Sequence, residues 1–95
     1  MRLELSRKVQ RDQYDIRDLS VQRFGVDRAV AYLNAFEATF RRILYFPDIS
    51  APHFALNPAA CAIGCQRHRI CYELGGNTVL IVRILHQAMD VARWI

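Results

Sequence analysis

The sequence predicts an α+β fold in the order β-α-α-β-β-β, in which a helical hairpin packs on one face of an antiparallel sheet. Two observations support this prediction. Apolar residues recur at helical spacing through the first half of the chain, and the second half contains three short apolar segments separated by glycine-containing turns. The 95 residues are enough for one domain, 1–95, with a single modest core.

The chain is expected to open with a short strand at residues 3–5, where apolar and charged residues alternate. Ser6 follows as a predicted N-cap, because its hydroxyl oxygen can accept a hydrogen bond from an amide of the next turn. The first helix is then expected over residues 7–23. Gln13 interrupts its apolar stripe, which consists of Val9, Ile16, Leu19 and Phe24.

A tight turn at residues 24–26 is expected to join this helix to a second one. Gly25 stands where a left-handed C-cap is needed, and Asp27 is the predicted N-cap of the next helix, over residues 28–46. Pro47 ends that helix. Its broad apolar face comprises Ala29, Val30, Leu33, Phe36, Phe40, Ile43 and Leu44.

Residues 47–58 contain three prolines and are expected to form an irregular surface connection. Three strands should follow, at 59–63, 67–74 and 78–86. Gly64 marks the first turn between them, and residues 75–77, Gly-Gly-Asn, mark the second. The last strand is almost continuously apolar, which is typical of a central strand buried on both faces. Residues 87–95 are expected to form a C-terminal tail, with a short helix as one option.

The formal net charge of +4 favours an acidic partner, such as nucleic acid, a protein bound to nucleic acid, or an acidic protein tail. A charge of this size is also common in small soluble domains, so it selects no partner. The N-terminal residues do not form the apolar core of a signal peptide, and the longest apolar run, 79–85, is interrupted by Arg83. We therefore expect a cytoplasmic protein that makes no contact with membranes.

The three cysteines lack CxxC spacing, and reduced thiols are expected. Cys61 and Cys71 are interpreted as small buried hydrophobic residues. Cys65, His68 and Cys71 are close enough in sequence to suggest zinc, but strand alternation sends some of these side chains to opposite faces of the sheet. No metal and no cofactor is therefore expected.

Catalytic chemistry has weak support in this sequence. No serine lies in a nucleophile-elbow sequence, and no glycine loop is suited to phosphate binding. A cationic set on the last two strands could supply parts of an RNA-cleaving site, which needs a base, an acid and positive charge. Its members are Arg67, Arg69, Arg83 and His86, with His68 between the first two and Arg93 in the tail. Solvated residues alternating along a half-buried strand give the same pattern, so we predict no catalytic residue.

Four segments, taken in order, resemble a known family. Residues 5–8, Leu-Ser-Arg-Lys, are similar to the family's opening, and residues 23–26, Arg-Phe-Gly-Val, to its helix turn. Residues 67–72, RHRICY, are similar to its His-x-Ile-Phe-Tyr strand. Residues 78–92, TVLIVRILHQAMDVA, are similar to its last strand and tail. On these segments the chain resembles the ParE toxins of the RelE/ParE toxin–antitoxin superfamily, which includes plasmid stabilisation proteins.

The resemblance implies a non-enzymatic toxin that binds DNA gyrase and is neutralised by a ParD-like antitoxin, whose C-terminal segment wraps around it. The alternative within the superfamily is a RelE-type endoribonuclease, which cleaves messenger RNA on the ribosome. No direct sequence-specific binding of nucleic acid is expected. The predicted partner-binding residues are Arg83, His86, Met89, Asp90, Arg93 and Trp94.

The chain departs from both family patterns. RelE-type nucleases usually carry a catalytic Tyr or His at the C-terminal end, whereas the tail after His86 offers only Arg93 and Trp94. Within the ParE pattern, Gln13 and Cys71 replace residues that are usually apolar and aromatic, and residues 59–61 lack an arginine often found there. The first departure weakens the nuclease alternative. If the missing arginine contacts the target, its absence reduces toxicity.

Overall fold

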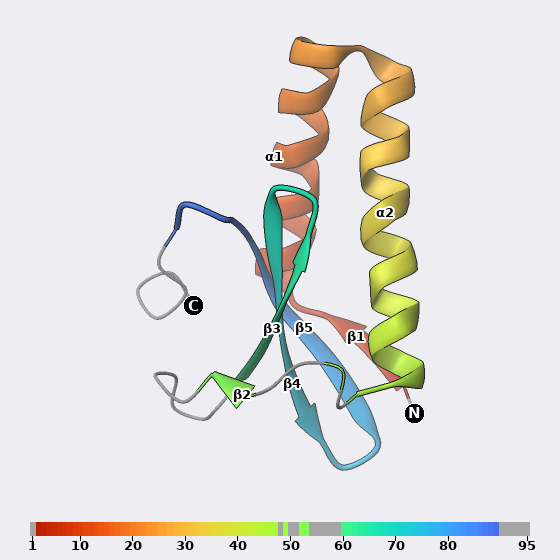
Figure 1. The fold of residues 1–95 in the computed structure, drawn as a ribbon, viewed down its shortest axis with the longest axis vertical. Helices are drawn as coiled ribbons and strands as arrows, with labels where there is room; N and C mark the ends of the chain where they lie inside the picture. The colour runs from red at the N-terminus through yellow and green to blue at the C-terminus, as the bar shows by residue number, and fades with distance from the viewer. Residues whose placement is uncertain (1, 48, 50–51, 54–59, 90–95) are drawn as a thin grey trace.

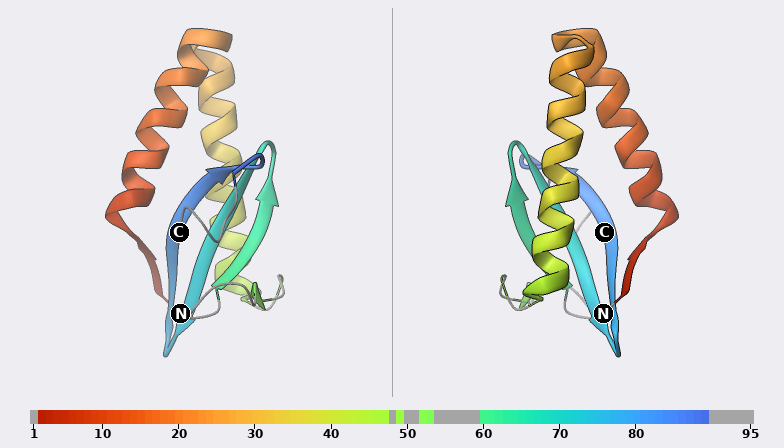
Figure 2. Two further views of the ribbon diagram at one scale, coloured as in Figure 1. Left: turned by 90° about the vertical axis from the view of Figure 1, so that its left-hand side faces the viewer. Right: turned by 90° about the vertical axis from the view of Figure 1, so that its right-hand side faces the viewer.

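The computed structural model describes residues 2–47, 49, 52–53 and 60–89. Two long helices pack as a hairpin on one face of a twisted sheet (Figure 1), which confirms the predicted α+β class. Figure 2 shows that the turn of the hairpin extends beyond the end of the sheet. The elements are β1 (Arg2–Leu5), α1 (Arg7–Phe24), α2 (Val26–Tyr45), β2 (Pro52–His53), β3 (Ala60–Cys65), β4 (His68–Gly75) and β5 (Thr78–His86).

The five-stranded sheet has the order β1-β5-β4-β3-β2. β2, β3, β4 and β5 pair with their neighbours in antiparallel fashion, but β1 runs parallel to β5, with Arg2 opposite Thr78 and Leu5 opposite Ile81. The prediction of an antiparallel sheet is wrong for this edge pair. No hairpin turn joins β1 to β5, so no local signal in the sequence sets their relative direction.

The connection predicted to be irregular contains the short edge strand β2, whose Pro52 lies opposite Cys61. A proline is tolerated there because an edge strand has one side without ladder hydrogen bonds. This corrects the expectation for residues 47–58 at positions 52 and 53. Residues 48, 50–51 and 54–59 of the same connection lie outside the described part of the chain, as does the predicted start of β3 at residue 59.

Ser6 joins α1 to the sheet as well as capping the helix. Its Oγ accepts the Val9 amide hydrogen at 3.1 Å, which confirms the predicted N-cap. The same hydroxyl donates to the carbonyl of Val82 at 2.8 Å, and the Ser6 amide donates to the carbonyl of Ile81 at 3.0 Å. α1 therefore begins in a fixed position against β5, just beyond the last residue of β1.

The turn of the hairpin uses a single residue, Gly25. Its φ of +86° is disfavoured for residues with a Cβ, and its amide donates to the carbonyl of Val21 at 3.0 Å. α2 begins immediately afterwards at Val26, so the N-cap is Gly25 and the predicted cap, Asp27, lies in the first helical turn. An acid in that turn still interacts favourably with the helix dipole. α2 ends at Tyr45, one residue before the predicted end.

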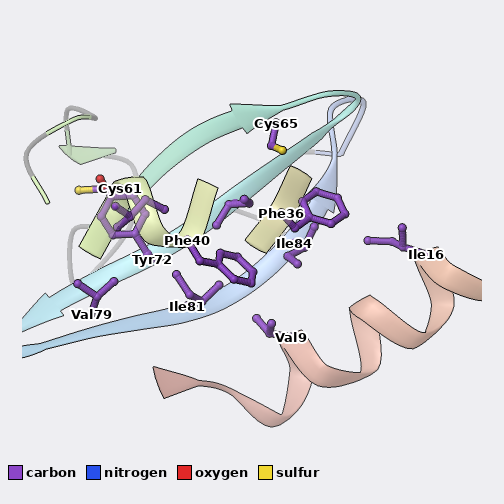
Figure 3. Close-up of a cluster of buried hydrophobic side chains, with 12 residues drawn as sticks. Val9, Ile16, Phe36, Phe40, Cys61, Cys65, Tyr72, Val79, Ile81 and Ile84 are labelled. Atoms are coloured by element: carbon purple, nitrogen blue, oxygen red, sulfur yellow. The ribbon is translucent and has the colours of Figure 1, made fainter. Parts of the chain in front are cut away.

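The main core lies between the hairpin and the sheet (Figure 3). Val9 and Ile16 project into it from α1, while Phe36, Phe40 and Ile43 project from α2. They pack on buried residues of the sheet, which include Ile70, Tyr72, Val79, Ile81 and Ile84.

Near the turn of the hairpin several residues of the two predicted apolar faces are exposed. The exposed fractions are 50% for Leu19, 55% for Phe24 and 51% for Val30. Leu19 and Phe24 belong to the end of α1 next to the turn, and the turn extends beyond the sheet (Figure 2). Val30 is exposed for another reason, because Ala29, nearer the turn on the same helix, is buried, so Val30 points away from the buried face.

A second cluster lies on the other face of the sheet, where Cys71 and Leu85 are buried. The ladder between β4 and β5 shifts register at Cys71/Tyr72, so that Cys71 faces Arg83 and Tyr72 faces Ile81. Ile81 and Ile84 can thus both face the hairpin although they are three residues apart. β5 is buried on both faces, as its apolar sequence predicts.

Candidate functional site

A pocket of about 490 Å³ opens between the distal half of the hairpin and the turn from β3 to β4. We call it the hairpin pocket. Its apolar wall consists of Ile16, Leu19 and Phe24 from α1 and Ala31 from α2. The volume is in the range usual for ligand-binding sites. The pocket exists because the hairpin is longer than the sheet it covers, which leaves the end of its inner face open.

The polar part of the hairpin pocket contains three arginines, Arg23, Arg28 and Arg67, and two histidines, His68 and His86. Of the pocket residues that the structure describes, none is acidic. Neither Asp nor Glu in the described part of the chain forms an ion pair with these arginines. The pocket is therefore an electropositive site with an apolar wall, which suits an amphipathic acidic ligand.

The floor of the pocket is a cluster of rings around His68. The Tyr32 hydroxyl lies 2.6 Å from His68 Nδ1, and the same oxygen accepts the Arg67 amide hydrogen at 3.3 Å. The His68 ring makes edge contacts with Phe36 and His86, with centroid distances of 5.7 Å and 5.4 Å. These contacts fix the position of His68 at the start of β4.

Burial lowers the pKa of His68 below its usual 6.5, and the neighbouring charge of His86 lowers it further, while Asp12 opposes the shift. Burial also raises the pKa of Tyr32. The lowered pKa favours the neutral form of His68 at pH 7, and its Nδ1 shares a hydrogen bond with the Tyr32 hydroxyl. Positive charge in the pocket at this pH comes from the arginines.

The pKa of His68 predicts a dependence of stability on pH. Because the folded protein binds the His68 proton less readily than the unfolded chain, acidification below pH 6.5 favours unfolding, and this contribution levels off below the folded-state pKa. The free energy of unfolding, measured by urea titration between pH 5 and 7.5, should fall less steeply towards acid pH in His68→Gln than in the original protein. If the free energy of unfolding depended on pH in the same way in both proteins, the lowered pKa of His68 would be contradicted.

Arg83 forms the best-buried ion pair among the described residues. Its Nε lies 2.9 Å and its Nη2 3.0 Å from the two carboxylate oxygens of Asp12, and the side chains are only 17% and 12% exposed. Asp12 Oδ2 also accepts the Ile84 amide hydrogen at 3.0 Å. This bidentate arrangement holds α1 against β5.

The structure does not gather the four residues of the alternative nuclease interpretation into one site. Arg67 and His86 line the hairpin pocket, where His86 is exposed and its Nδ1 accepts the Ala88 amide hydrogen. Arg69 is exposed and, by strand alternation, projects from the opposite face to His68. Arg83 is paired with Asp12.

The predicted partner-binding residues divide into three groups. His86 lies at the hairpin pocket, and Arg83 is in the ion pair with α1. Met89 packs against the cluster of Cys71 and Leu85 on the other face of the sheet. Asp90, Arg93 and Trp94 lie outside the described residues, together with most of the predicted tail at 87–95.

All three cysteines are buried, which confirms the interpretation of Cys61 and Cys71. Burial raises the pKa of the Cys71 thiol to about 11, so it is protonated at neutral pH. Cys71 belongs to the outer cluster, whereas Cys65 accepts a hydrogen bond from Thr39 on the hairpin side. Cys65 and Cys71 thus project to opposite faces, and the described residues include no group of three or more potential metal ligands.

Sequence reasoning missed Tyr32, Arg28 and Asp12. Tyr32 lies one helical turn before Phe36 and so shares its face of α2, which is a signal that could have placed it near the sheet. Asp12 and Arg83 lie far apart in the sequence, and neither is unusual in composition or spacing. Their pairing becomes visible only when α1 is placed along β5.

The fold of a helical hairpin on a twisted sheet has a solved counterpart. It is similar to a structure titled "Chromosomal ParDE TA system from P. aeruginosa", with a TM-score of 0.79, 18% identity and coverage of 90% of this chain and 95% of the other. At 18% identity the likeness to this structure shows a shared fold and nothing more. The family is shown by the sequence comparisons that follow.

The family described as "ParE toxin of type II toxin-antitoxin system, parDE" matches residues 3–91. The chain is 36% identical over 86 residues to Toxin ParE1 of Caulobacter vibrioides, covering 90% of this chain and 88% of that toxin. It is 32% identical over 90 residues to Toxin ParE1 of Mycobacterium tuberculosis, covering 94% and 92%. The chain belongs to the ParE toxin family and is a toxin of a type II toxin–antitoxin system. Neither described helix combines the length and apolar character needed to cross a membrane.

Proposed function

We propose that this toxin inhibits DNA gyrase by binding to it, and that a ParD-like antitoxin neutralises it in the cytoplasm. Membership of the ParE family is the observation that supports this proposal most strongly. The geometry adds support, because Arg69 and Arg83 lie outside the pocket that Arg67 and His86 share, so the four residues of the nuclease alternative do not form one site. A mechanism based on binding needs no such site.

The proposal is tested with purified gyrase, relaxed plasmid and ATP, with the toxin alone and with its antitoxin added. We expect loss of supercoiling, accumulation of cleaved DNA, and reversal of both effects by the antitoxin. Gyrase that stays fully active beside a toxin that stops growth in cells would contradict the gyrase target.

We further propose that Arg83, His86 and the tail contribute to the partner interface. Removal of residues 87–95 should then abolish growth inhibition or antitoxin binding, because it removes Met89, Asp90, Arg93 and Trp94 together. Growth assays and pull-down with the antitoxin measure the two outcomes. Truncation also removes the packing of Met89 on Leu85, so full-length Arg93→Ala/Trp94→Ala serves as the second variant. Retention of both activities in the two variants would contradict this placement.

A further inference from the structure

We propose that a second copy of the toxin docks on the outer face of the helical hairpin, the side of α1 and α2 turned away from the sheet. In this homodimer the two hairpins pack as a four-helix bundle about a two-fold axis. The outer face shares no lining residue with the hairpin pocket, so the inference does not rest on the proposed function. It is marked by Tyr14, Arg17 and Val21 of α1 and by Val26, Val30 and Glu37 of α2.

Helical spacing places these residues on one side of the hairpin. Ile16 of α1 is buried in the main core, and Tyr14, two residues before it, lies about 160° around the helix from it. Val26, Val30 and Glu37 follow at intervals of four and seven residues and therefore share one side of α2. A cavity of about 340 Å³ lies between the two helices, and every described residue that lines it belongs to α1 or α2, Tyr14 and Glu37 included.

The outer face is apolar towards the turn of the hairpin. The exposed fractions are 58% for Tyr14, 39% for Val21, 62% for Val26 and 51% for Val30. A helix that already packs one face on a sheet normally carries polar residues on its other side. Exposed apolar side chains gathered on two adjacent helices therefore indicate a contact with another molecule.

The polar groups beside them match a second copy of the same surface. The cavity is lined by the side-chain amides of Gln10, Gln13 and Asn34. An amide both donates and accepts hydrogen bonds, so an identical amide is a suitable partner for it. Across a two-fold axis the same patch of both copies meets, which satisfies such groups without a different protein. Gln13 thus interrupts the apolar stripe of α1 at a position that belongs to the contact between copies.

The charges of the outer face are also self-complementary. Arg17 and Glu37 are the charged residues among those described that line the cavity. No described cation forms an ion pair with Glu37, whereas Arg17 bonds Asp18 at 3.1 Å in an exposed contact. The guanidinium has further N–H donors for a second carboxylate. A two-fold axis through the cavity places Arg17 of each copy near Glu37 of the other. This balanced pair does not attract a polyanion, although the chain carries a net charge of +4.

The size of the outer face suits a dimer. α1 has 18 residues and α2 has 20, so the helices are about 27 Å and 30 Å long, and side by side they are about 20 Å wide. The face they present is thus on the order of 600 Å² in projection, and its accessible surface is larger because side chains project from it. A stable interface buries about 800 Å² on each partner. Full overlap of the two hairpins therefore reaches the required size.

Sedimentation equilibrium of the purified toxin between about 1 and 100 µM tests the proposal, and we expect a homodimer with a Kd on the order of 10 µM. Val30→Glu should raise this Kd about ten-fold or more, because it places an unpaired carboxylate in the apolar part of the contact. Val30 is half exposed, so the fold should stay intact by circular dichroism. Phe46→Glu makes the same change in charge at an exposed residue just after α2, and should alter the Kd by less than about two-fold. A toxin that is monomeric throughout, or equal losses in both variants, would overturn the proposal.

The charge pair is tested by mixing two variants. Arg17→Glu and Glu37→Arg should each weaken the homodimer about ten-fold, because each brings like charges together at both symmetric contacts. In an equimolar mixture the heterodimer has opposite charges at both contacts, so its Kd should return to within about three-fold of the original value. Charges that meet within one copy cannot produce this recovery. A mixture that dimerises no better than the single variants would overturn the two-fold arrangement. Neither assay contains gyrase or antitoxin, so a negative result leaves the proposed function standing.

Discussion

Phe36→Ala is expected to lower the free energy of unfolding by about 3–5 kcal/mol, the largest effect of any single substitution considered for this toxin. Phe36 is fully buried in the main core. Its ring contacts Tyr32 and His68 edge to face, with centroid distances of 5.3 Å and 5.7 Å. Removing it leaves a cavity directly beneath the hairpin pocket. Urea unfolding followed by circular dichroism measures the change.

Phe46→Ala is the matched control, because Phe46 is 67% exposed and should contribute less than about 1 kcal/mol. A small domain has a total stability of about 5–15 kcal/mol, so Phe36→Ala removes a large share of it. Similar losses in the two variants would contradict the assignment of Phe36 to the buried core.

Asp12→Ala is expected to lower the free energy of unfolding by about 2–3 kcal/mol, because it removes the carboxylate from a largely buried pair. Arg83 loses its bidentate partner, and the Ile84 amide loses its acceptor. Asp15→Ala is the control, since Asp15 lies on the same helix and is exposed. Its effect should stay within about 0.5 kcal/mol.

A double-mutant cycle with Asp12→Ala and Arg83→Ala separates the ion pair from the hydrogen bond to the Ile84 amide. We expect a coupling energy of about 1–2 kcal/mol between the two side chains. Additive effects would mean that the pair contributes little, and that Asp12 acts mainly through the backbone of β5.

The local features of the fold could be predicted because each has a local physical cause. The hydroxyl of Ser6 caps the helix that follows it, and Gly25 adopts the positive φ that the turn requires. The turn between β4 and β5 forms within the predicted Gly-Gly-Asn segment, with Gly76 at positive φ. The turn between β3 and β4 falls instead at Gln66 and Arg67, because the predicted turn residue Gly64 pairs within β3. The parallel pairing of β1 with β5 has no such local cause, and the exposure of Leu19 and Phe24 depends on where the sheet ends rather than on the period of the helix.

The candidate site was predictable only in part, for the same reason. Arg67, His68 and His86 were singled out from two strands, and the register of β4 with β5 brings the two histidines opposite each other. Tyr32 and Arg28 come from a helix whose placement on the sheet no pattern in the sequence specifies. The pairing of Asp12 with Arg83 likewise depends on the path of α1 along β5.

The contacts of α1 with β5 have a consequence for self-association. Beyond Ile81 no strand of the described part of the chain pairs with β5 on the side of β1, which would leave its main chain there open to pairing with another molecule. There the carbonyl of Val82 is occupied by Ser6 and the amide of Ile84 by Asp12. The side chains of the α1 N-cap and of Asp12 thus take two of the main-chain groups that a neighbouring strand would bond, so another polypeptide cannot pair continuously with this stretch of β5.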